Sequence, residues 1–439
     1  MQFKIESFLN ANLPAGGTRV DVVFSLSALC VAGAGEAGAG EAGAGEAGAG
    51  AQAAPHRVIG LLGDRSGSMS GPKMDALKHA LRVAVDAMDD DTEFFVVAFD
   101  TKARMSVPPT RADGAGKRAA HAQIQRIEAG GGTALSTGLA AARGVFAARQ
   151  GAVCQVILLT DGQNGVEDTA VLGRELSAGA GLYQAHCRGV GTDWSPKELR
   201  RIAEALLGTA QLVADPAGMA EDFRATMAAA MALGVADVRL RLWMPKNTRL
   251  TGFKQGFPTE IDLLSSLRPV DQRAVDLPLG AWSEGTQDYC ASFTVVPLPT
   301  GEQMLVCRPS IVTPDVVTRG DQVLPGANVT CTWTDDASLS ARIDPQVAHY
   351  SGQAEKARAI QEGLEAMERH DDGTATIRLG RALQLAQQSG DEETTRRLRQ
   401  VVDVVDEAQG TVRLRRGADK VAVMDLDVGS TRTVRVKRD

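Results

Sequence analysis

The fold is constrained most by the alternation of two kinds of segment between residues 55 and 232. Short apolar runs typical of buried strands alternate with longer segments whose apolar residues recur at helical spacing. The predicted strands include RVIGLLG, EFFVVAF, CQVILLT and LYQAHCRGVG, and the predicted helices include PKMDALKHALRVAVDAM, ALSTGLAAARGVFAA and SPKELRRIAEAL. This pattern favours a doubly wound, Rossmann-like α/β domain with parallel strands and helices on both faces of the sheet. In such sheets ligands bind at the carboxyl ends of the strands.

The segments on either side of this α/β domain have a different pattern. Residues 1–31 contain two β-rich stretches joined by the turn PAGG, which predicts a β-hairpin. Residues 32–54 repeat the pentapeptide GAGEA and are expected to be a low-complexity linker. Residues 233–342 combine short strands and turns, which predicts a β-sandwich. Because the hairpin has no partner within residues 55–232, we expect it to join the sandwich, so that the α/β domain is inserted into it.

The C-terminal part of the chain is predicted to be helical and then extended. Residues 343–410 contain three segments with helical spacing, separated at Gly373 and Gly390, and the last of them is DEETTRRLRQVVDVVDEAQ. Helix hairpins of this length resemble tetratricopeptide-type repeats. Residues 411–439 are predicted to be an extended, mildly basic segment.

Composition restricts the classes of partner. The formal net charge of −7 argues against nucleic acid, which is bound by strongly basic domains. No apolar run approaches the roughly 18 residues that a membrane span needs, and MQFKIESFLN has no signal-peptide core. The six cysteines form no C-x-x-C pair, which suits a reducing compartment. We therefore expect a cytoplasmic protein whose partners are neither nucleic acid nor membrane.

Three clusters of oxygen-bearing side chains fall where predicted strands end and helices begin. Asp64, Ser66 and Ser68 follow the first strand, Thr133 precedes a helix, and Asp161 follows the strand ILLT. Two carboxylates and three hydroxyls form a hard, all-oxygen ligand set, which suits Mg²⁺ or Mn²⁺. Taken singly, the two serines and the threonine could instead be helix caps. Their joint occurrence at strand ends favours a metal site.

Two other chemistries fit the same loop less well. The hydrolase elbow G-x-S-x-G is absent, because methionine is the central residue of GSMSG at residues 67–71. The histidines lie outside the strand-to-helix junctions, so a serine nucleophile would have no base. The phosphate-binding pattern G-x-x-x-x-G-K-[ST] is also absent, and two aspartates would repel a phosphate.

The order D-R-S-G-S-M, G-G-G-T, L-L-T-D-G on alternating strands and helices resembles the von Willebrand factor type A (VWA) domain. The resemblance implies a metal-ion-dependent adhesion site, with Ser66, Ser68 and Thr133 as direct ligands and the aspartates bound directly or through water. Further segments, among them CRGVGTDWSPKELRRIA, DPQVAHYSGQAEKA and VVDVVDEAQGTVRLR, are similar to a group of actinobacterial cytosolic VWA proteins. One departure is Gly63, where such domains usually carry an apolar or acidic residue. We expect it to loosen the loop.

The resemblance implies a binding module, not an enzyme, in which a partner protein supplies an Asp or Glu to the metal. By analogy with bacterial VWA proteins, the partner would be an AAA+ ATPase or a kinase–phosphatase system acting in stress, signalling or conflict defence. A metal-dependent hydrolase or phosphatase is the alternative. It would need a general base or a second metal near the site, for which Asp100 and Asp168 are the nearest candidates, although both are more simply turn and helix-cap residues. A third alternative is a structural subunit whose metal only makes the loops rigid.

Overall fold

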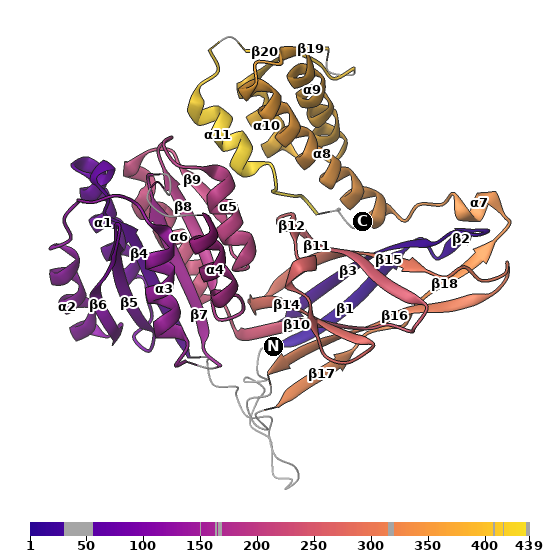
Figure 1. Cartoon of the computed structure of the whole chain (residues 1–439), viewed down its shortest axis with the longest axis horizontal. Coiled ribbons are helices and arrows are strands. Elements are labelled where there is room, and N and C mark those ends of the chain that lie inside the picture. Colours follow the sequence, from indigo (N-terminus) through magenta and orange to yellow (C-terminus); the bar gives the residue numbers. More distant parts are fainter. Residues whose placement is uncertain are drawn as a thin grey trace, which may run out of the picture.

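The computed structural model describes residues 1–29, 56–149, 151–162, 165, 169–314, 320–406, 409–415 and 417–435. The repeated GAGEA segment at residues 32–54 lies outside these ranges. Figure 1 shows three parts: an α/β domain, a β-sandwich beside it, and a helical region above the two.

The α/β domain contains a six-stranded sheet. Its strand order is β6-β5-β4-β7-β8-β9, and five neighbouring strands are parallel. The exception is β6, which pairs antiparallel with β5, although the alternating pattern predicted parallel pairing. A tight connection between β5 and β6 leaves no room for a crossover helix, so the second strand folds straight back. The strands are β4 (Arg57–Asp64), β5 (Glu93–Phe99), β6 (Ala103–Arg111), β7 (Val153–Thr160), β8 (Gln184–Val190) and β9 (Ala210–Val213).

Helices cover both faces of this sheet, as the sequence pattern predicts. Side chains of β4 alternate between the two faces: Ile59 and Leu61 belong to one core, and Val58 and Leu62 to the other. The first core is closed by α1 (Pro72–Asp86), α2 (Gly114–Ile124) and α6 (Met219–Met231), and the second by α3 (Leu135–Phe146), α4 (Thr169–Gly179) and α5 (Pro196–Ala205). The α/β fold class is therefore confirmed.

The β-sandwich is assembled from the chain segments that precede and follow the α/β domain. One sheet has the order β1-β3-β15-β11-β12, and the other has the order β13-β14-β10-β16-β18-β2, with β17 paired to β16. The N-terminal strand β3 pairs antiparallel with β15, so the chain leaves the sandwich, forms the α/β domain and returns. The strands are β1 (Gln2–Leu9), β2 (Asn12–Pro14), β3 (Arg19–Leu29), β10 (Val235–Trp243), β11 (Thr248–Phe257), β12 (Ile261–Asp262), β13 (Arg268–Pro269), β14 (Ala274–Trp282), β15 (Gly285–Val295), β16 (Gln303–Pro314), β17 (Asp321–Pro325) and β18 (Val329–Thr334).

The helical region corrects two predictions made from the sequence. The third predicted helix ends at Val401, and the β-branched run that follows forms a strand paired with a second short strand. The segment predicted to be extended contains a helix, capped by the Asp419 carboxylate, which accepts from the Val421 backbone N–H at 3.1 Å. The elements are α7 (Ala337–Ser340), α8 (Pro345–Glu368), α9 (Asp372–Gln388), α10 (Glu392–Val401), β19 (Val402–Asp406), β20 (Thr411–Leu414) and α11 (Lys420–Gly429).

The helical region joins the other two parts. Tyr350 of α8 packs on Val23 of the sandwich, and its hydroxyl donates to Asp288 at 2.5 Å. Met424 and Val428 of α11 pack into the α/β core beside α5. Among the described residues no helix is long and apolar enough to cross a membrane.

Candidate metal centre

The predicted site lies where β4 and β7 end. These strands are parallel neighbours, with Gly63 opposite Leu159, so their carboxyl ends meet at one edge of the sheet. Asp64 is the last residue of β4, and Asp161 directly follows β7. Thr133 lies two residues before α3. Parallel pairing thus brings together residues almost a hundred positions apart.

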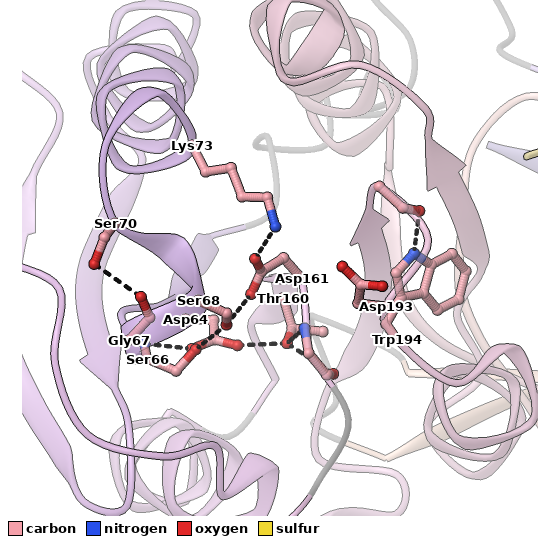
Figure 2. A network of polar contacts seen from close by, with 12 residues as sticks. Asp64, Ser66, Gly67, Ser68, Ser70, Lys73, Thr160, Asp161, Asp193 and Trp194 are labelled. Carbon is pink, nitrogen blue, oxygen red and sulfur yellow. Dashed lines mark hydrogen bonds and ion pairs between the residues drawn. The ribbon is translucent and has the colours of Figure 1, made fainter.

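The hydroxyl groups of the serines connect the two strand ends. The Ser68 hydroxyl donates to Asp161 Oδ1 at 2.7 Å, and Ser66 Oγ lies 3.0 Å from Ser68 Oγ. Figure 2 shows these side chains turned toward one another beside Asp64. A Cβ added at Gly162 would lie 3.3 Å from Thr133 Oγ1 and 3.7 Å from Ser68 Oγ, so the threonine hydroxyl faces the same space. The structure therefore brings all five predicted residues together.

Both carboxylates are buried, with no exposed surface on Asp64 or Asp161. Burial raises the pKa of Asp64 above its ordinary value, and the nearby charge of Asp161 adds to the increase. Hydrogen bonds oppose the shift: Thr160 Oγ1 donates to Asp64 Oδ2 at 2.5 Å, and the Ser66 N–H donates to Oδ1 at 2.7 Å. Two buried carboxylates this close favour a compensating positive charge.

The alternative that these residues are helix caps is not supported by their contacts. The cap of α3 is Ala134, so Thr133 lies outside the helix. Ser66 does occupy the N-cap position of the short 3₁₀ turn, but its side chain makes no capping hydrogen bond. Ser68 lies inside the short 3₁₀ turn Gly67–Met69, and its hydroxyl contacts Asp161 across the sheet edge. These hydroxyl groups thus face the site.

Two residues at the site were missed by the sequence analysis. Thr160 holds Asp64, and the Lys73 ammonium forms an ion pair with Asp161 Oδ2. Thr160 directly precedes Asp161 in LLTDG, so its place at the strand end was a usable signal. The position of Lys73 follows from the packing of α1, which no local pattern reveals.

Backbone contacts hold the serine loop in place. The Arg65 N–H donates to the Phe99 carbonyl at 2.8 Å, and its carbonyl accepts from the Gly130 N–H at 2.7 Å. The Arg65 guanidinium pairs with Asp100, so Arg65 anchors the loop. The expectation that Gly63 loosens the loop is wrong, because Gly63 lies within β4 and is paired on both sides. A Cβ there would stand 3.1 Å from Leu77, so the glycine allows close packing of α1.

The donor set fits a hard divalent cation. Within the described residues no group of three or more His, Cys, Asp or Glu side chains could hold a metal, so a metal here would depend on the hydroxyls. Mg²⁺ and Mn²⁺ accept such oxygen ligands, together with water.

Of the two candidate general bases of the hydrolase alternative, Asp100 lies among the described residues. Asp100 accepts from the Lys102 N–H at 2.8 Å and from Arg65. Burial alone would raise the pKa of Asp100, but the hydrogen bonds from Lys102 and Arg65 and the charge of Arg65 hold it below its ordinary value. Because its carboxylate is occupied by Arg65, Asp100 is a poor general base. Asp168 lies outside the described residues.

Comparison with known proteins identifies the class that this fold and site define. A family model for the von Willebrand factor type A domain matches residues 58–212, and a model for the von Willebrand factor type A C-terminal domain matches residues 384–430. A von Willebrand factor type A structure from Catenulispora acidiphila is 40% identical, covers 99% of this chain and 97% of that chain, and has a TM-score of 0.90. The chain belongs to the VWA family.

More distant matches share less with this chain. The ArnB paralog VWA2 from Sulfolobus acidocaldarius has the same fold, with 14% identity, 98% coverage of each chain and a TM-score of 0.62. An uncharacterized protein of Synechocystis sp. is 29% identical over 46% of this chain and 49% of its own. Human inter-alpha-trypsin inhibitor heavy chain H4 is 31% identical over 32% of this chain and 16% of its own. The chain thus spans half or less of the length of these curated relatives.

Proposed function

We propose that this chain is a protein-binding module that uses Mg²⁺ or Mn²⁺ to bind a carboxylate of a partner protein. VWA domains are commonly non-enzymatic interaction modules, which supports the binding class. The observation that carries the proposal is the convergence of two buried carboxylates and three hydroxyls at one edge of the sheet. Asp64, Ser66, Ser68, Thr133 and Asp161 would hold the ion.

The charge of this ligand set determines what the module would bind. The two carboxylates would cancel the charge of a divalent ion, and the hydroxyl ligands are neutral. The bound ion would supply a Lewis-acidic open position, and an Asp or Glu of the partner matches it in charge and hardness. Because Ser66 contacts Ser68 and the Ser68 hydroxyl ties the loop to Asp161, the site would be ready before the partner arrives.

We further propose a cytoplasmic partner in a bacterial stress, signalling or conflict-defence system, such as an AAA+ ATPase or a kinase–phosphatase pair. This part rests on analogy with other VWA proteins. The hydrolase alternative needs a general base, and the one described candidate, Asp100, is held by Arg65.

Co-purification from native cells tests the binding proposal. In Mg²⁺ buffer the wild-type chain should retain one or more proteins that are lost in chelator and lost with Asp64→Ala, because both treatments remove the ion. Asp113→Ala is the matched control, since Asp113 is an exposed cap of α2. Circular dichroism should show that each variant is folded.

Two outcomes would contradict this proposal. A partner that survives both chelator and Asp64→Ala would exclude a metal bridge. Turnover of a generic phosphoester such as p-nitrophenyl phosphate, lost with Asp64→Ala, would favour the hydrolase.

A further inference from the structure

Lys73 places a positive charge of the protein itself inside the candidate metal centre. It is the second residue of α1, and its Nζ forms an ion pair with Asp161 Oδ2. The other oxygen of that carboxylate accepts from the Ser68 hydroxyl at 2.7 Å. Figure 2 shows Lys73 reaching from the helix toward the carboxylate. Both oxygens of Asp161 are therefore already engaged by side chains of this chain.

The contacts of Asp64 differ from those of Asp161. Its two oxygens accept from the Ser66 N–H and the Thr160 hydroxyl, which are neutral donors. The nearby Arg65 is engaged by Asp100 and by the Glu128 carbonyl at 3.1 Å. Among the residues that the structure describes, Lys73 is thus the cation paired with these two buried carboxylates, through Asp161.

Lys73 is also able to move away. About 28% of its side chain is exposed, whereas Asp161 has no exposed surface. A partly exposed lysine at the end of a flexible stem can turn into water at small cost, but a buried carboxylate cannot. The ammonium is therefore the exchangeable member of the ion pair.

We propose that the Lys73 ammonium competes with the divalent ion for the Asp161 carboxylate, so that the site exchanges one cation for the other. This inference rests on the proposed metal-binding function. Asp64, Asp161 and Lys73 together carry one net negative charge, and a divalent ion would make the total one net positive charge. Repulsion between the ammonium and the ion lowers metal affinity when no partner is bound. A partner carboxylate cancels the surplus charge, so binding of the metal and of the partner reinforce each other.

Replacing Lys73 by Met tests the competition directly, since Met keeps the length of the stem and removes the charge. In titrations of the full chain with Mn²⁺ alone, Lys73→Met should bind the ion at least about tenfold more tightly than wild type. Lys78→Met, in the same helix but more than a turn away, should bind Mn²⁺ as wild type does. Mn²⁺ binding that is lost in Asp64→Ala occurs at the candidate metal centre.

Melting in chelator gives a second measurement that involves no metal. Lys73→Met should melt at a lower temperature than wild type and than Lys78→Met, because Asp161 loses its counter-charge. Adding Mn²⁺ should raise the melting temperature of Lys73→Met more than that of wild type, because the ion then replaces the missing cation.

The outcomes separate this inference from the proposed function. If wild type binds Mn²⁺ in an Asp64-dependent way and Lys73→Met binds it equally or less tightly, the competition is refuted and the metal site remains. If neither binds Mn²⁺ at the site, both are refuted. A Lys73→Met chain that melts like wild type in chelator would refute the role of Lys73 as counter-charge.

Discussion

Ser68→Ala is expected to weaken Mg²⁺ or Mn²⁺ binding by about 100-fold, the upper end of the losses seen when groups around a metal are removed. The Ser68 hydroxyl lies 3.0 Å from Ser66 Oγ and donates to Asp161 Oδ1 at 2.7 Å. Its loss removes a proposed ligand and also the hydrogen bond that orients Asp161. Both effects act in the same direction on metal affinity.

The same loop contains a matched control for this prediction. Ser70 lies two residues further on, is exposed, and its hydroxyl donates to the Gly67 carbonyl at 2.8 Å. Ser70→Ala should therefore leave metal affinity within about twofold of wild type, since its hydroxyl is turned away from the site. Isothermal titration with Mg²⁺ and Mn²⁺ measures both variants. If Ser68→Ala and Ser70→Ala lost metal affinity equally, the cause would be damage to the loop. If Ser68→Ala bound the metal as wild type does, the Ser68 hydroxyl would not be a metal ligand.

Asp391→Ala is expected to lower the free energy of unfolding of the helical region by about 3–5 kcal/mol. The carboxylate forms a buried ion pair with Lys356 of α8, whose side chain is about 1% exposed. Burial alone would raise the pKa of Asp391, but the hydrogen bond and charge of Lys356 hold it below its ordinary value. Without Asp391 the ammonium would stay buried with Gln353 Oε1, 2.6 Å away, as its main partner.

Asp371→Ala separates the loss of the ion pair from the loss of a helix cap. Asp371 caps α9 by accepting from the Thr374 N–H at 3.1 Å, as Asp391 caps α10 by accepting from the Thr394 N–H at 2.9 Å. Asp371 is exposed, so its replacement should have a smaller effect. Urea denaturation and hydrogen exchange of α10 measure the difference. The double variant Lys356→Met/Asp391→Leu should recover most of the loss, because it removes both buried charges. Equal effects of the two aspartate variants would contradict the prediction.

The sequence was sufficient to predict the α/β fold because local patterns determine it. Alternating strands and helices can bury their apolar faces in few ways, so the pattern predicted a sheet covered on both faces. The sandwich assembled from two distant segments followed from the unpaired N-terminal hairpin. The helical prediction for residues 402–406 was wrong because their β-branched run pairs with β20 in a local hairpin. Residues 420–429 depend on a tertiary partner, since they form a helix that buries Met424 and Val428 against the α/β domain.

The candidate site also has one part that the sequence predicted and one part that only the tertiary structure revealed. The sequence by itself determined that Asp64, Thr133 and Asp161 meet at the sheet edge, because they stand at the ends of strands or before a helix. Only the tertiary structure decided the charge inside that site. Lys73 reaches Asp161, 88 residues away, because α1 begins shortly after β4 and β7 is the parallel neighbour of β4 in the sheet. Arg65 pairs with Asp100, which directly follows β5. Such contacts depend on how helices and loops cross in space, whereas strand ends are set by short-range periodicity and by the parallel pairing it implies.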